Sequence, residues 1–182
     1  SFTFLCLAFM HTEQELLFLI DVFREVTKDK RTASPQLLLV GSPEGNKPAP
    51  RVLRRAALNP AIHLALANPD KEDIALYMGA VDTIVLPHFA IQRAGTSETA
   101  LLGLSYGHLL VAPNLPRFSG MLPTRASIFY EPGSRESLAH ALAKAQKLFF
   151  ALSEEETASL DAASGWEQYT HRLVKLYRQL LN

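Results

Sequence analysis

The sequence lacks the features that mark secreted, membrane-spanning and nucleic-acid-binding proteins. It has one cysteine in 182 residues, so no internal disulfide can form. No apolar run approaches the roughly 20 residues that a membrane-spanning helix needs. Eighteen basic residues balance eighteen acidic ones, which gives no charge excess that would attract nucleic acid or an anionic membrane. We therefore expect no nucleic-acid partner and a cytoplasmic protein, with any contact to the inner membrane face made through another part of the parent chain.

Several familiar motifs are also missing. There is no Gly-x-x-x-x-Gly-Lys-Ser/Thr loop, and no Gly-x-Gly-x-x-Gly follows the first apolar run. Kinase, ATPase and dinucleotide-oxidoreductase functions are therefore disfavoured. The six histidines are scattered without metal-ligand spacing, and no Asp-x-Asp pair offers a magnesium site. The sequence thus predicts neither a metal ion nor a cofactor.

What is present is an alternation of apolar, β-prone runs with helical patterns. This alternation predicts an α/β fold, a doubly wound parallel sheet of about six strands with helices on both faces. In such a sheet ligands bind at the carboxyl ends of the strands. The predicted strands are residues 2–9, 36–40, 61–66, 82–86, 108–112 and 127–130. The predicted helices run from Thr12 to about Thr27, from Pro50 to Leu58, from Asp70 to Met78, from Thr96 or Ser97 onward, and over 134–152, with two more over 154–163 and 166–181.

One domain accounts for the whole chain, residues 1–182. Its first strand begins at once, without a basic segment before it that would suggest a signal peptide. Because the sequence starts inside a core strand, we expect it to be a fragment of a longer, two-domain protein.

The most informative stretch is residues 92–107, QRAGTSETALLGLSYG, which follows the fourth strand. A nucleophilic serine needs Gly-x-Ser-x-Gly, and Thr99 stands where the second glycine belongs. Two interpretations remain open. Thr96 or Ser97 either simply caps a helix, or begins a helix whose free N–H groups hold a diphosphate, with Gly95 allowing close approach and Arg93 adding charge.

Two further groups of charged or titratable residues stand out. His11 and His88 each follow a strand, which places both at the expected ligand edge of the sheet. Arg51, Arg54 and Arg55 share one helix, and such a basic face is usually solvated.

Taken together, these segments resemble the C-terminal, donor-binding domain of group 1 glycosyltransferases of the GT-B fold. The segments are FLIDVFREV, QLLLVGSPEGN, DIALYMGAVDTIVLP, TSETALLGLSYGHLLVAPNLP and SIFYEPGSRESLAHALAKA. The run ALLGLSYGHLLVAP is the most distinctive of them. The resemblance implies a glycosyltransferase that binds a nucleotide-sugar donor here, transfers the sugar to an acceptor held by an N-terminal domain, and uses no metal ion.

The resemblance also assigns roles to residues. It places His11, Arg93, Gly95, Thr96 and Ser97 at the donor diphosphate. It places Glu98 at the donor sugar or ribose, and Gly41 and Asn68 at the edge of the nucleobase.

The chain departs from the family at four positions. His11 and Gln14 stand where an arginine and a lysine are usual, and Ala94 and Leu102 stand where two glutamates are usual. An alternative interpretation is therefore a GT-B-like domain that has lost donor chemistry and has a structural or regulatory role.

Overall fold

The core of the molecule is a six-stranded parallel sheet. The computed structural model describes residues 2–28, 35–42, 49–67, 69–89 and 97–151. The strand order in the sheet is β3-β2-β1-β4-β5-β6, and every neighbouring pair is parallel. The strands are β1 (Thr3–Leu7), β2 (Gln36–Val40), β3 (Ile62–Ala65), β4 (Thr83–Val85), β5 (Leu109–Pro113) and β6 (Ser127–Tyr130). The predicted doubly wound α/β fold is confirmed.

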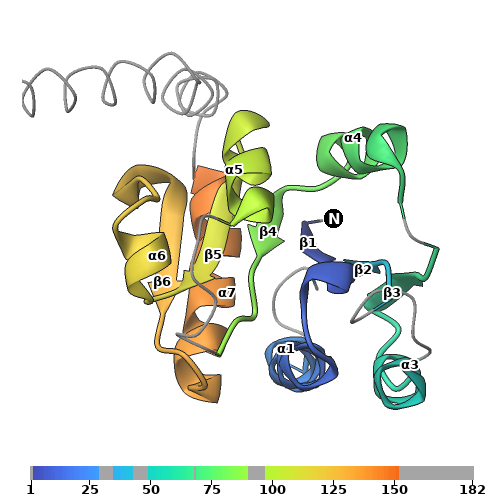
Figure 1. Cartoon of the computed structure of the whole chain (residues 1–182). Coiled ribbons are helices and arrows are strands. Elements are labelled where there is room, and N and C mark those ends of the chain that lie inside the picture. Colours follow the sequence, from blue (N-terminus) through green and yellow to red (C-terminus); the bar gives the residue numbers. More distant parts are fainter. Residues whose placement is uncertain (1, 29–34, 43–48, 68, 90–96, 152–182) are drawn as a thin grey trace, which may run out of the picture.

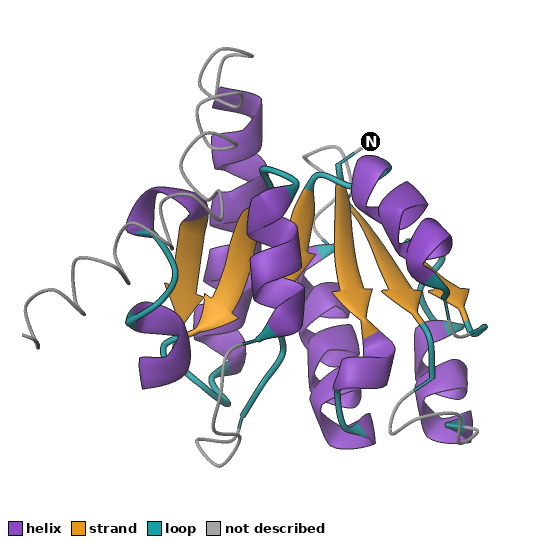
Figure 2. Cartoon of the chain, turned by 45° about the horizontal axis from the view of Figure 1, so that its top comes forward, coloured by secondary structure: helices purple, strands orange, loops and turns teal. Residues whose placement is uncertain are grey.

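Helices cover both faces of this sheet (Figures 1 and 2). One face carries α1 (Glu13–Val26), α3 (Pro50–Ala56) and α7 (Arg135–Ala151). The other carries α4 (Lys71–Gly79), α5 (Glu98–Ser105) and α6 (Pro116–Ser119). Successive side chains of a strand point to opposite faces, so Phe4 joins the first core and Leu5 the second. Both faces are apolar because both are covered.

The helix starts at Thr12 and Ser134 follow the predicted capping residues. Thr12 caps α1 in a reciprocal arrangement, because its hydroxyl accepts from the Glu15 N–H while the Glu15 carboxylate accepts from the Thr12 N–H. Asp70 and Asp73 form the same arrangement at α4. Ser134 accepts from the Ser137 N–H at the start of α7.

Several element boundaries differ from prediction by one or two residues, and some short elements were not predicted. The first strand ends at Leu7, and residues Ala8–Met10 form the 3-10 turn η1. The short elements α6 and η2 (Thr124–Ala126) have no counterpart in the prediction, because three or four residues carry no periodicity. The predicted helices over 154–163 and 166–181 lie outside the described residues. Within the described part of the chain, no helix combines the length and apolarity that crossing a bilayer requires.

Gly103 sets how closely α5 approaches the sheet. A Cβ at this position would lie 2.7 Å from Ile84 Cδ1 and 2.7 Å from Leu110 Cδ2, which belong to β4 and β5. The missing side chain therefore lets the helix pack directly on the two strands whose carboxyl ends it faces.

We expect Gly103→Val to lower the free energy of unfolding by about 1–3 kcal/mol, because it overfills a packed core. Gly79, near the end of α4, is the matched control because its Cβ would meet nothing within 4 Å. Gly79→Val should leave stability within about 0.5 kcal/mol of wild type. Urea denaturation followed by circular dichroism measures both, and equal losses for the two variants would contradict this account of Gly103.

Candidate functional site

The candidate site lies at the carboxyl edge of the sheet, where β1 and β4 are neighbours. From β1 the chain connects to β2 on one side, and from β4 to β5 on the other. The loops after β1 and β4 therefore part in opposite directions, and in doubly wound sheets ligands bind at such a point.

The start of α5 faces this edge. Ser97 is the N-cap, and its hydroxyl accepts from the Ala100 N–H at 3.3 Å. Of the two residues predicted as the cap, Ser97 therefore has this role. Glu98 is exposed in the first turn, whereas Thr99 is buried. The first N–H groups of a helix have no partner within it, so those of Glu98 and Thr99 provide donors at the helix start.

Several predicted site residues cannot be compared with the structure. Arg93, Ala94, Gly95 and Thr96 precede α5 and lie outside the described residues, as does Asn68 after β3. Their assignments at the diphosphate and nucleobase stay predictions.

A buried histidine–glutamate–histidine cluster occupies the space between the ends of β1 and β4. His11 follows η1, Glu15 lies in the first turn of α1, and His88 follows β4. These residues are only 1%, 5% and 6% exposed. His11 Nδ1 lies 3.7 Å from Glu15 Oε2, and His88 Nδ1 lies 3.4 Å from Glu15 Oε1. The two imidazole rings are 4.3 Å apart between centroids.

Main-chain groups hold the Glu15 carboxylate in place. Oε2 accepts from the Thr12 N–H at 2.9 Å, and Oε1 accepts from the Phe89 N–H at 3.2 Å. Burial alone would raise the pKa of Glu15. Its contacts with the His11 and His88 imidazoles and the Thr12 N–H outweigh burial and hold that pKa well below its ordinary value. Glu15 is therefore a buried carboxylate that joins α1 to the loop after β4.

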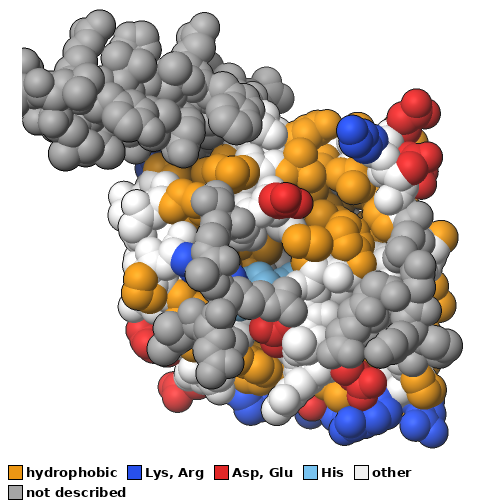
Figure 3. Space-filling view, viewed as in Figure 1, with side chains coloured by type: hydrophobic (Ala, Val, Ile, Leu, Met, Phe, Trp, Pro, Cys, Tyr) orange, Lys and Arg blue, Asp and Glu red, His pale blue; other side chains and the backbone are white. Residues whose placement is uncertain are grey.

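An aromatic stack extends the cluster toward β5. His88 lies against Phe118 of α6, with 5.7 Å between ring centroids and 19° between planes. The guanidinium of Arg117 lies 4.5 Å from the centroid of the Phe118 ring. Histidine atoms are visible in the middle of the face shown in Figure 3. Because it lies against Phe118, the guanidinium of Arg117 is a half-buried cation at the same edge of the sheet.

Other predicted residues lie apart from this cluster. Gly41 ends β2 with φ +85°, and a Cβ there would lie 2.7 Å from Phe9 Cδ1, so a backbone requirement explains this glycine. Gln14 is exposed on α1. Leu102, where the family has a glutamate, is half-buried and packs against the second core.

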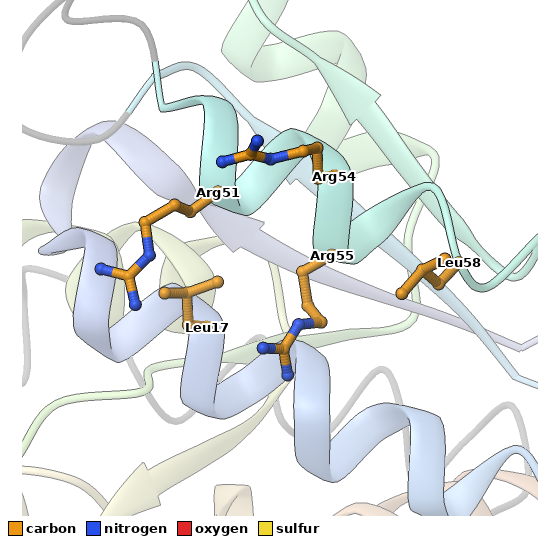
Figure 4. Close-up of a pocket in the computed structure, with 5 residues that line it drawn as sticks. All are labelled: Leu17, Arg51, Arg54, Arg55 and Leu58. Atoms are coloured by element: carbon orange, nitrogen blue, oxygen red, sulfur yellow. The ribbon is translucent and has the colours of Figure 1, made fainter.

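The basic helix face lies elsewhere. Arg51, Arg54 and Arg55 of α3 line a hollow together with Leu17 and Leu58 (Figure 4). Arg51 pairs with Glu13 at 3.1 Å, and Arg55 pairs with Asp21 at 2.5 Å. These half-exposed ion pairs agree with a solvated face that joins α3 to α1.

Sequence reasoning placed His11 and His88 at this edge but missed Glu15 and Arg117. The sequence around Glu15 indicates only a capping role. Because 73 positions separate Glu15 from His88, no local pattern links the two residues. Arg117 follows β5, so its position just past a strand end was the one available signal.

Comparison with known proteins identifies the fold of this chain. No protein-family model matches the sequence, and no curated protein matches it either. Among solved structures, sucrose-phosphate synthase from Thermosynechococcus elongatus is similar with a TM-score of 0.65 and 18% identity, over 100% of this chain and 46% of that one. A trehalose-6-phosphate protein from E. coli, bound with UDP-2-fluoro glucose, has a TM-score of 0.68 and 12% identity, over 89% and 40%.

The catalytic domain of starch synthase IV from Arabidopsis thaliana, bound to ADP and acarbose, has a TM-score of 0.63 and 15% identity, over 97% of this chain and 37% of that one. The chain spans less than half the length of each of these three structures. It therefore has the fold of one Rossmann-like domain of the GT-B glycosyltransferases, in agreement with the predicted C-terminal domain.

Proposed function

We propose that this chain is the donor-binding domain of a glycosyltransferase. It binds a nucleotide-sugar at the carboxyl edge of its sheet, and the sugar passes to an acceptor held by an N-terminal domain of the same parent protein. The observation that carries the proposal is the position of the α5 N-terminus, which lies where the strand order of the sheet reverses. Proteins with a similar fold include one bound with UDP-2-fluoro glucose and one bound with ADP.

The donor diphosphate lies at the N-terminus of α5 in this proposal. Main-chain N–H groups and the positive end of the helix dipole stabilise a bound anion. Gly95, Thr96 and Arg93 supply the rest of the contact, and Glu98 reaches a hydroxyl of the donor sugar or ribose. Arg117 adds a cation at the same edge. The donor needs no metal ion in this arrangement.

Binding of UDP, GDP and ADP to the 182-residue chain tests the proposal. Calorimetry or NMR in EDTA should show micromolar to millimolar affinity for at least one of them. Thr96→Ala with Ser97→Ala should weaken that affinity about tenfold or more, because hydrogen bonds to charged groups contribute about 1.5–3 kcal/mol each. Ser105→Ala, at the other end of α5, should change nothing. If none of UDP, GDP and ADP binds measurably, the proposal is refuted for this domain.

One observation favours a second candidate, a GT-B-like domain with a structural role. Leu102 is half-buried against the second core, and as a leucine it offers the donor no carboxylate at that position. Sugar transfer by the full-length protein, abolished by the Thr96→Ala and Ser97→Ala pair, would rule this candidate out. A full-length protein that binds no nucleotide and transfers no sugar would support it.

A further inference from the structure

The cluster at the β1–β4 edge has the composition of a metal site. His11, Glu15 and His88 each offer one ligand atom, and these atoms lie within 4.8 Å of one another. We propose that His11, Glu15 and His88 bind one divalent transition-metal ion of the zinc class. This site adjoins the proposed donor site, since the resemblance places His11 at the donor diphosphate, and its test uses no nucleotide, so that either proposal can fail without the other.

The two imidazole–carboxylate contacts are longer than ideal charge-assisted hydrogen bonds and close to the spacing of two ligands on one ion. A charge-assisted hydrogen bond between an imidazole and a carboxylate measures about 2.7–2.9 Å. The contacts here are 3.4 Å and 3.7 Å. Zinc–nitrogen and zinc–oxygen bonds of about 2.0–2.1 Å at tetrahedral angles place two ligands about 3.3–3.4 Å apart.

The surroundings hold the ligands as outer-shell groups hold them in metal sites. The Thr12 and Phe89 N–H groups fix the two oxygens of Glu15. The Phe118 ring packs on His88 and limits its rotation. Each ligand comes from a different segment: His11 follows η1, Glu15 lies in the first turn of the capped helix α1, and His88 lies in the loop after β4. Such support keeps ligands at coordination geometry.

The choice of ligands selects the metal. Two imidazoles and one carboxylate suit zinc and related first-row ions. Magnesium and calcium prefer oxygen ligands, which only Glu15 offers. The Glu15 oxygens accept from the Thr12 and Phe89 N–H groups, an arrangement that suits the carboxylate form, which is the form that binds metal. Three protein ligands leave a fourth position for water.

Zinc titration of the metal-free 182-residue chain tests the site without any nucleotide. After treatment with EDTA and its removal, competition with a chromophoric chelator should show one tightly bound zinc ion and no effect of magnesium. His88→Gln should weaken zinc affinity at least about 100-fold, since outer-shell changes alone cost 10–100-fold. His63→Gln is the matched control, because this imidazole is exposed on β3 and pairs with Gln36 at 2.7 Å. It should leave zinc affinity unchanged.

Two results would overturn the proposal. One is a zinc affinity that His88→Gln and His63→Gln alter equally or not at all. The other comes from the wild-type chain, so it does not depend on whether a variant folds. Cobalt substitution should give the strong visible bands of a four-coordinate ion, and zinc should shift the ring resonances of two histidines in NMR spectra. Weak six-coordinate bands, or no histidine shifts, would exclude this site.

Discussion

Replacing Glu15 by alanine is expected to lower the free energy of unfolding by about 3–5 kcal/mol in metal-free buffer at neutral pH. Removal of one partner from a buried charged network has costs of that size, because the remaining polar groups are left desolvated and unpaired. In this chain the Thr12 and Phe89 N–H groups would both lose their acceptor, and α1 would lose half of its capping box.

Glu13→Ala is the matched control for this effect. Glu13 lies in the same first turn, but its partner Arg51 is 69% exposed and the pair lies at the surface. An exposed pair contributes about 1 kcal/mol or less. Urea denaturation in EDTA measures both variants. A loss below 1 kcal/mol for Glu15→Ala would show that the cluster is not an energetic link between α1 and the loop after β4.

The sheet was predictable because each strand is a local signal. A strand buried on both faces reads as a short continuous apolar run, and QLLLV at 36–40 is the clearest example, with the observed β2 bounds Gln36–Val40. Capping residues are equally local, since Thr12 and Ser97 act on the N–H three residues later. The order of the strands then follows from the few topologies that parallel connections allow.

The cluster was only half predictable because its chemistry depends on contacts distant in sequence. The rule that ligands bind at strand ends selected His11 and His88. It could not show that Glu15, whose role within α1 is capping, also accepts from the Phe89 N–H 74 residues away. The same capping contact makes the N-termini of α1 and α5 different. The Glu15 carboxylate already lies at the N-terminus of α1, whereas at α5 the acidic side chain, Glu98, is exposed and can move away.

The second large effect is expected at the centre of the sheet, where Phe4→Ala should lower the free energy of unfolding by about 3–5 kcal/mol. Phe4 is fully buried on β1, between β2 and β4. Its ring meets Phe2 edge-on at 4.9 Å and Phe23 of α1 at 6.1 Å, so alanine removes contacts to both the strand and the helix.

Leu76→Ala on α4 is the matched control for Phe4→Ala. It also removes a large apolar side chain, but one that is 72% exposed, so the change should stay within about 0.5 kcal/mol. Because β1 precedes the turn that carries His11, loosening this strand should also disturb the cluster. The His11 ring resonances should therefore shift in Phe4→Ala and not in Leu76→Ala. A Phe4→Ala protein with wild-type stability would mean that α1 and the sheet are held together by the capping box and Glu15 rather than by this core.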